Sequence, residues 1–257
     1  MMHLLAAAAA IAAAPPAFER PLTPALFEVR DADTTIYIFG SFHVLDGRGQ
    51  WFNRGIRDAF DQSDELVLET LVPKDPVAPI PVARSFSQPV ATSASFLATT
   101  RMAVDAGRSQ GMQLAKGADM VLRDTADAEG KRVEGLETLQ SQLTMFLRMP
   151  AAAPAARKAA SAGADRTLPA TMVALQAAWK RGDQRVFADM LNQLSNSSPE
   201  TYKLMFVDRN ARWADWIAGR MQTPGVVFVA VGAGHLAGRD SLLVRLAEQG
   251  IESTRLN

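Results

Sequence analysis

The chain contains no cysteine among its 257 residues. Disulfide bonds, thiolate metal sites, a cysteine nucleophile and a lipoprotein anchor are therefore excluded. The 27 basic and 27 acidic residues leave no net charge, and no basic block occurs, so a nucleic acid is not an expected partner. Histidine is also scarce, since the chain has three. A site that uses imidazole must draw on these few positions.

Long apolar runs are also lacking, apart from an alanine-rich stretch near the N-terminus. This stretch has the length of the apolar part of a signal peptide and is too short to cross a bilayer. Ala12 and Ala14 are small enough for a cleavage site, although no Lys or Arg precedes the stretch. We predict that residues 1–17 are a signal peptide and that the protein is periplasmic or secreted, without a transmembrane anchor. The alternative is an alanine-rich tail on a cytoplasmic protein.

Two continuous apolar runs, over 36–39 and 226–231, predict strands over 34–39 and 226–231 that are buried on both faces. Such strands are typical of a sheet covered by helices. For residues 18–257 we therefore predict one domain with an α/β (α+β) fold. Its N- and C-terminal parts form a mixed central sheet, and a helical insertion occupies about 90–220. Further strands are expected over 27–29, 66–68, 132–136 and 253–256, helices over 53–62, 110–127, 139–147, 169–181, 183–194, 199–220 and 239–249, a weak helix or a linker over 150–166, and a proline-rich loop over 72–90.

The two histidines outside the leader occur in the same local pattern. Gly40 and His43 are spaced as Gly-x-x-His directly after the first buried strand. Gly232 and His235 repeat this spacing after the second. Glycine at these places lets the backbone turn sharply or approach a ligand closely. The repeated pattern predicts that the two imidazoles share one site, because α/β sheets bind ligands at the carboxyl ends of their strands.

Two glutamates occupy equivalent places, because Glu69 and Glu137 each follow a predicted core strand. If these strands are parallel neighbours, both carboxylates gather with the histidines at one edge of the sheet. Imidazoles and carboxylates suit a divalent metal ion, and a carboxylate left off the metal can act as general base. We predict that His43, His235 and one glutamate, such as Glu69, hold the ion. The simpler alternative is hydrogen-bonded or surface histidines and glutamates that favour a helix dipole.

Arg209 shares one stripe of the predicted helix 199–220 with Met205, Trp213 and Trp216. This position predicts a partly buried arginine, for which two interpretations remain open. In the first, its stem packs along the tryptophans while its head lies in water. In the second, its guanidinium reaches the site and holds a carboxylate or an oxyanion.

The chain resembles the TraB/GumN family, which also includes the Tiki-type metalloproteases. The resemblance rests on five segments in the expected order, IFGSFH, DELVLE, GLETLQSQL, DRN and VGAGHL, and covers about residues 25–257. In that family, two Gly-x-x-His histidines act with acidic residues, and the Tiki-type members hydrolyse peptides with a metal. The resemblance implies site roles for His43, His235, Glu69 and Glu137, and supporting roles for Arg209 and Asn210.

Three functional hypotheses follow. The first is an exported metal-dependent hydrolase that acts on peptide bonds, with Mn²⁺, Co²⁺ or Zn²⁺ as cofactor. The second is a metal-free hydrolase in which a histidine is the base, as in the erythromycin-esterase-like proteins that this architecture also resembles. The third is a protein that binds a peptide or a polysaccharide without cleaving it. For an enzyme, Glu69, Glu137 and Arg209 are the expected catalytic residues, and Gly40, Gly232 and Asn210 the supporting ones.

Overall fold

The computed structural model describes residues 22–71, 102–150 and 154–257, and it describes no side chain over 154–166. The predicted signal peptide and the proline-rich segment 72–90 lie outside the described residues. None of the described helices is long and apolar enough to cross a membrane.

Six strands form one mixed sheet, in the order β4-β3-β5-β2-β1-β6. Neighbouring strands from β4 to β2 are parallel, while β1 and β6 complete one edge in antiparallel pairing. The predicted mixed α/β sheet is thus confirmed, although one of its strands, at 132–137, comes from the middle of the chain and lies within the predicted helical insertion. The strands are β1 (Leu26–Arg30), β2 (Thr34–Ser41), β3 (Glu65–Thr70), β4 (Arg132–Glu137), β5 (Gly225–Gly232) and β6 (Thr254–Arg255).

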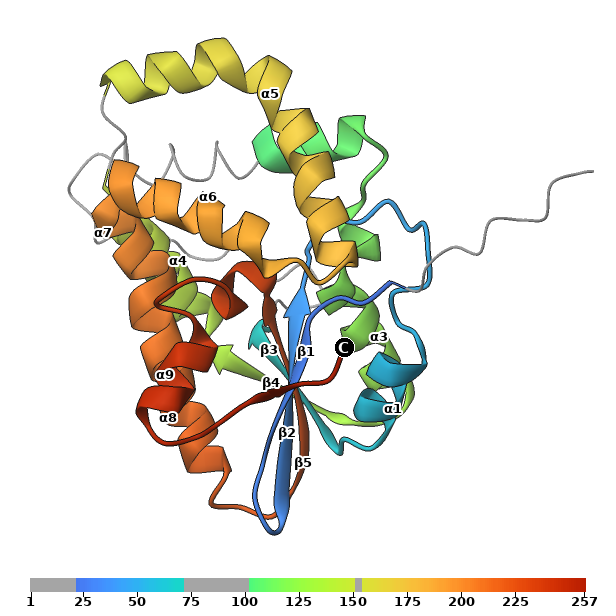
Figure 1. Ribbon diagram of the computed structural model, residues 1–257. Coiled ribbons are helices and arrows are strands. Elements are labelled where there is room, and N and C mark those ends of the chain that lie inside the picture. Colours follow the sequence, from blue (N-terminus) through green and yellow to red (C-terminus); the bar gives the residue numbers. More distant parts are fainter. Residues whose placement is uncertain (1–21, 72–101, 151–153) are drawn as a thin grey trace, which may run out of the picture.

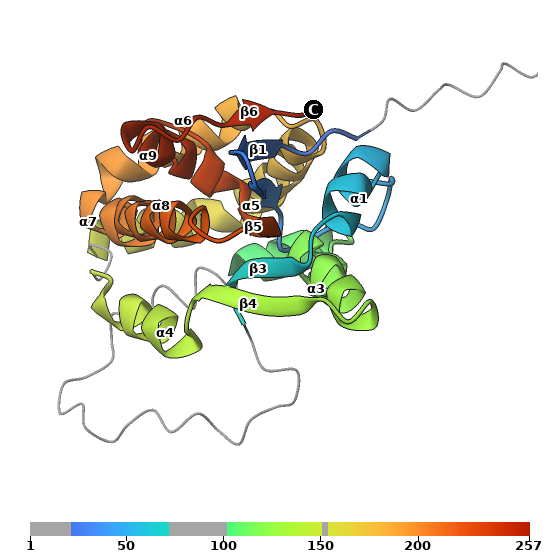
Figure 2. The ribbon, with the colours of Figure 1, turned by 90° about the horizontal axis from the view of Figure 1, so that it is seen from below.

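Helices cover both faces of the sheet and its carboxyl edge. Figure 2 shows α8 and α9 on one face and α1 and α3 on the other, and Figure 1 shows α5 and α6 beyond the ends of the central strands. The helices are α1 (Arg54–Asp61), a helical segment over 102–109, α3 (Ala118–Ala128), α4 (Leu139–Arg148), α5 (Pro154–Lys180), α6 (Gln184–Ser197), α7 (Pro199–Tyr202), α8 (Asp208–Arg220) and α9 (Leu242–Glu248).

Strand β2 explains why the sheet is covered on both sides. Its alternate residues Tyr37 and Phe39 belong to the core under α1 and α3. Ile36 and Ile38 belong to the core under α8 and α9. Because side chains alternate across a strand, a run that is apolar at every position can only be buried on both faces. The sequence-based prediction for this strand is therefore confirmed.

Several predicted helix boundaries differ from the structure. The predicted helix 110–127 is a 3-10 turn (Leu114–Lys116) followed by α3, with the break at Gly117. A β-carbon on Gly117 would collide with the carbonyl group of His43, so this glycine permits a close backbone approach. Residues 154–180 form a single helix, α5, which includes Pro169. The predicted helix 199–220 is interrupted by a π-helical turn (Lys203–Val207) between α7 and α8.

Candidate functional site

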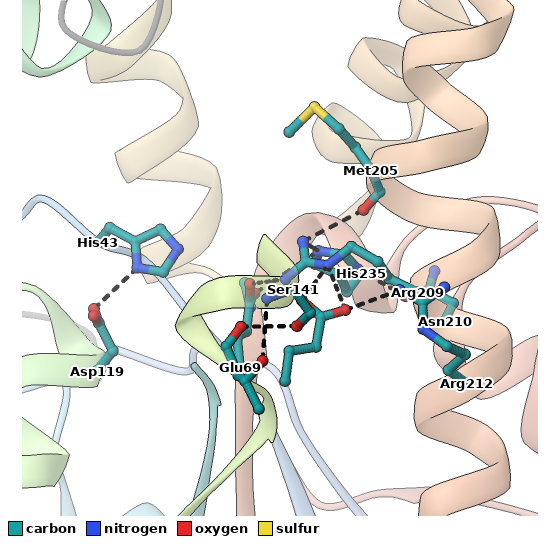
Figure 3. Close-up of polar contacts among 12 residues, drawn as sticks. His43, Glu69, Asp119, Ser141, Met205, Arg209, Asn210, Arg212 and His235 are labelled. Carbon is teal, nitrogen blue, oxygen red and sulfur yellow. Dashed lines mark hydrogen bonds and ion pairs between the residues drawn. The ribbon is translucent and has the colours of Figure 1, made fainter. Parts of the chain in front are cut away.

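The four predicted strand-end residues lie at one edge of the sheet. In the sheet register Ser41 at the end of β2 pairs with Gly232 at the end of β5, so the turns that carry the two histidines leave side by side. Thr70 of β3 pairs with Glu137 of β4, and Glu69 precedes this pair. Parallel neighbours thus bring together side chains from distant parts of the chain, as Figure 3 shows.

The space above Gly232 is the point that the predicted ligands share. A β-carbon built on Gly232 would lie 3.1 Å from Oε1 of Glu69, 3.7 Å from Cδ2 of His235 and 3.8 Å from Nε2 of His43. Glycine keeps this space open, and its amide donates to Oε1 of Glu69 over 2.6 Å. The other predicted glycine also permits close packing, because a β-carbon on Gly40 would lie 3.3 Å from Leu236 in the turn that carries His235.

Arg209 is the central cation of the site. Its Nη2 donates to Oε2 of Glu69 over 2.7 Å, and its Nε lies 3.0 and 3.1 Å from the two carboxylate oxygens of Glu137. The residue is 3% exposed, and its guanidinium lies 4.4 Å from the ring centroid of Trp213. The guanidinium is therefore not in water but holds two carboxylates at the strand ends, as in the second interpretation, and it also contacts Trp213, as in the first.

His235 is held in one tautomer. Nη1 of Arg209 lies 3.2 Å from its Nε2, and Oδ1 of Asn210 lies 2.6 Å from its Nδ1. A guanidinium can only donate, so Nε2 accepts and Nδ1 carries the proton. Asn210 donates its amide hydrogen to the carbonyl of Asp240, which fixes the side-chain orientation. Burial and the charge of Arg209 lower the pKa of His235 to about 3, so the ring is neutral near pH 7.

Glu69 is an anion. Burial alone would raise its pKa, but the charge of Arg209, with that of His43 and the amide of Gly232, holds the pKa well below its usual range. One carboxylate oxygen faces Arg209 and the other faces the space over Gly232. The side chain is therefore fixed at both oxygens.

His43 differs from His235 in being accessible, since its side chain is 56% exposed. Its Nδ1 lies 3.2 Å from Oδ1 of Asp119. Partial loss of hydration around the ring lowers the pKa of His43, but Asp119 and the charge of Glu69 outweigh this and raise it to about 9. Among the described residues no hydrogen bond occupies Nε2, which faces the space over Gly232. This nitrogen is free to exchange a proton with a bound molecule.

Sequence reasoning did not identify Asp119. It lies in the first turn of α3, and the amide of Ala118 donates to the carbonyl of Phe42 over 2.9 Å. This contact brings the start of α3 to the turn that carries His43. The signal in the sequence is Gly117, because a glycine before an acidic first helical turn can mark a close backbone approach.

A pocket of about 220 Å³ opens beside His43 and Glu69. Ser41 and Thr70 line it, and their hydroxyl oxygens are buried without a hydrogen-bond partner in the described part of the chain. An unsatisfied buried hydroxyl costs about 1–3 kcal/mol, so these groups favour a polar occupant. The other lining residues are Leu68, Asp119, Gln142 and Ala230.

The donors do not fit a metal ion in this arrangement. His43 and Glu69 turn a nitrogen and an oxygen toward the space over Gly232, but His235 turns a carbon atom toward it. Both nitrogens of His235 are already engaged by Arg209 and Asn210. Residues 22–71, 102–150 and 154–257 include no group of three or more His, Asp or Glu that could hold a metal. Metal binding by His43, His235 and Glu69 thus stays a prediction.

A sheet that presents two Gly-x-x-His turns at its carboxyl edge defines an α/β protein with a polar strand-end site. The chain belongs to the TraB/PrgY/gumN family, whose profile matches residues 25–88 and 83–255. The resemblance found in the sequence is therefore confirmed. Comparison with curated proteins and with solved structures gave no match.

Proposed function

We propose that the chain is a hydrolase that acts on peptide bonds and that the pocket beside His43 and Glu69 is its reaction site. One observation carries the proposal: Nε2 of His43 and Oε1 of Glu69 face the same open space above Gly232. A proton acceptor and a fixed carboxylate around one small space can activate and orient a water molecule.

His43 is the proposed general base. Asp119 holds the Nδ1 side of the ring, so Nε2 remains for the substrate side. Neutral His43 removes a proton from water as the oxygen attacks the carbonyl carbon of the peptide bond. The imidazolium then returns this proton to the leaving amine as the carbon–nitrogen bond breaks. Water is the only co-reactant.

Glu69 orients the attacking water, while Arg209 and Glu137 act as positioning residues. The Nε, Nη1 and Nη2 atoms of Arg209 are each engaged, with Glu137, Met205, His235 and Glu69 as partners. Arg209 therefore keeps Glu69 ionised and in place without touching the substrate. Glu137 holds Arg209 in turn.

Metal-dependent hydrolysis is the second candidate function, with Mn²⁺, Co²⁺ or Zn²⁺ as the ion. The observation that favours it is that two of the three predicted ligands, His43 and Glu69, already direct donor atoms to one point. A third ligand would require His235 to exchange its contact with Arg209 for the ion. Export of the protein remains a proposal that accompanies both functions.

The test is hydrolysis of a mixed peptide library by untagged protein, followed by mass spectrometry, with and without a chelator. We expect cleavage that survives chelation and falls at least about 100-fold in His43→Ala, as loss of a general base does. Arg54→Gln is a control, since the Arg54 side chain is 95% exposed on α1. Loss of cleavage on chelation, restored by one of the three ions, would replace the first candidate by the second. If the protein binds peptides but cleaves none of them, with or without added metal ions, it is a binding protein and both hydrolase proposals are wrong.

A further inference from the structure

A second pocket lies beside the reaction pocket, and we propose that it binds an acidic side chain of the peptide substrate. This inference rests on the proposed function, because it names the class of peptide that the site takes. The pocket has a volume of about 650 Å³ and is bounded by the end of β4, by α4 and by α8. Its walls include Glu137, Ser141, Arg148, Leu204 and Arg212.

Consecutive residues of α4 line the two pockets. Ser141 lines the second pocket and the next residue, Gln142, lines the reaction pocket. Glu137 stands between them, because its carboxylate is bound by Arg209 from the reaction site and by Arg212 over 3.1 Å from the other side. Figure 3 shows Ser141 and Arg212 beside this cluster. An extended peptide that passes α4 would therefore contact both pockets.

Two arginines and two carboxylates line the second pocket, so its charges balance, but both carboxylates are already engaged by cations. Glu137 is shared by two arginines, Arg209 and Arg212. Asp208, the other acidic residue in the wall, is paired with Lys203. Arg148 has no ion-pair or hydrogen-bond partner among the described residues. The pocket therefore favours an anionic group, for which a guanidinium offers paired donors.

The remaining walls match an acidic side chain rather than a bare anion. Leu136, Met145 and Leu204 supply apolar surface for a short methylene stem. Thr138 also lines the pocket, and its hydroxyl accepts from the amide of Ser141 and keeps its hydrogen for a carboxylate. The hydroxyls of Ser141 and Thr144 donate to backbone carbonyls instead. Glutamate, with two methylene groups and one carboxylate, combines these features. Arg148 is exposed, so solvent limits the expected gain to about two- to fivefold in affinity.

The experiment compares two probes, an acetylated and amidated Ala-Ala-Glu-Ala-Ala peptide and its Gln counterpart, by calorimetry. The protein carries His43→Ala, so that neither probe is consumed. We expect the Glu peptide to bind about two- to fivefold tighter, and this preference to shrink at high salt. Arg148→Gln should abolish the preference, Arg148→Lys should keep part of it, and the exposed control Arg54→Gln should leave it unchanged.

Equal affinities for the two peptides, no binding of either at millimolar concentration, or a preference that persists in Arg148→Gln would overturn the inference. The melting temperature of each variant checks that the fold is retained. The outcome is separate from the proposed function, because binding is measured without turnover. If the Glu peptide is preferred but the wild type cleaves no peptide, the second pocket is an acidic-side-chain site and the hydrolase proposal fails. If the wild type cleaves peptides but shows no preference for Glu, the hydrolase proposal stands and the inference about the second pocket fails.

Discussion

Nη1 of Arg209 lies 3.2 Å from Nε2 of His235. The contact uses the lone pair that a metal would need, and it places a permanent positive charge beside a neutral imidazole. The same guanidinium also holds Glu69 and Glu137. A protein cation thus neutralises the carboxylates at the carboxyl edge of the sheet, where the sequence predicted an added ion.

Replacing Arg209 by methionine should destabilise the protein strongly. Glu69 and Glu137 would lose their buried partner, although Glu137 would keep Arg212. Breaking a buried ion pair from one side typically costs about 3–5 kcal/mol, which urea unfolding at pH 7 can measure. The triple variant with Glu69→Gln and Glu137→Gln should recover part of this loss. A loss below about 1 kcal/mol in the single variant would show that the network contributes little.

Asn210→Ala should remove the acceptor that fixes the tautomer of His235. The N–H of a buried ring would then lack a partner, and the free energy of unfolding should fall by about 1–3 kcal/mol. Thermal unfolding gives the measurement. Asn192→Ala, at an exposed position on α6, is the matched control and should change stability by less than about 0.5 kcal/mol. Equal effects of the two substitutions would contradict the role of Asn210.

The sequence predicted the strand-end glutamates and histidines because parallel strands carry their last residues to one edge. It could not predict what Arg209 does, because both of its interpretations suit an arginine between a methionine and tryptophans on a helix. The deciding feature is how the helix that carries Arg209 sits against β3 and β4, and this depends on packing across the sheet. Asp119 was missed for a similar reason. Its contact with His43 depends on the close approach of the Gly117 backbone to the carbonyl group of His43, and the periodicity of apolar residues does not predict such an approach.

Gly232→Ala should reduce activity much more than stability. The backbone of Gly232 has φ −54° and ψ 137°, which alanine adopts without strain. Its new methyl group, however, would lie 3.1 Å from Oε1 of Glu69 and fill the space where we place the reacting water. We expect kcat/KM to fall at least about tenfold, or 1.4 kcal/mol in transition-state stabilisation.

Gly219→Ala is the control for that substitution. Gly219 lies in α8 with nothing near its β-carbon position, so alanine should raise stability by about 0.5–1 kcal/mol and leave kcat/KM unchanged. Wild-type kcat/KM in Gly232→Ala would show that the reaction does not use the space above this residue.

The ion pair between His43 and Asp119 should make stability depend on pH on the alkaline side. The pKa of His43 is raised from 6.5 to about 9, so the protonated ring stabilises the folded state fully below pH 6.5. This contribution is lost as the pH rises through about 9. Chemical unfolding at several pH values should show the loss in the wild type and little of it in Asp119→Asn. Because the His43 side chain is 56% exposed, solvent screens the ion pair and reduces its contribution. The test is therefore the direction in which the free energy of unfolding changes with pH, and not the size of that change.

The same pair predicts a pH profile for hydrolysis. The general base must be neutral, so kcat/KM should rise with pH through the pKa of His43 in the free enzyme. Asp119→Asn removes the charge that raises this pKa, and the rising limb should move to lower pH. NMR titration of the His43 ring in both proteins gives an independent value. Identical profiles for the two proteins would assign the limb to another group.

Strand β5 lies between β3 and β2 in the sheet, although it is encoded near the end of the chain. The contacts of Glu69 with Arg209 and with Gly232 join residues 140 and 163 positions apart. During synthesis, β2 and β3 therefore cannot pair with β5 until the C-terminal part of the chain has been made. Their apolar edges remain exposed until then. Long-range parallel pairing of this kind is slow, so refolding should lag behind helix formation. The polar site forms only after β5 has paired with β2 and β3, so a nascent chain that lacks β5 has no assembled site.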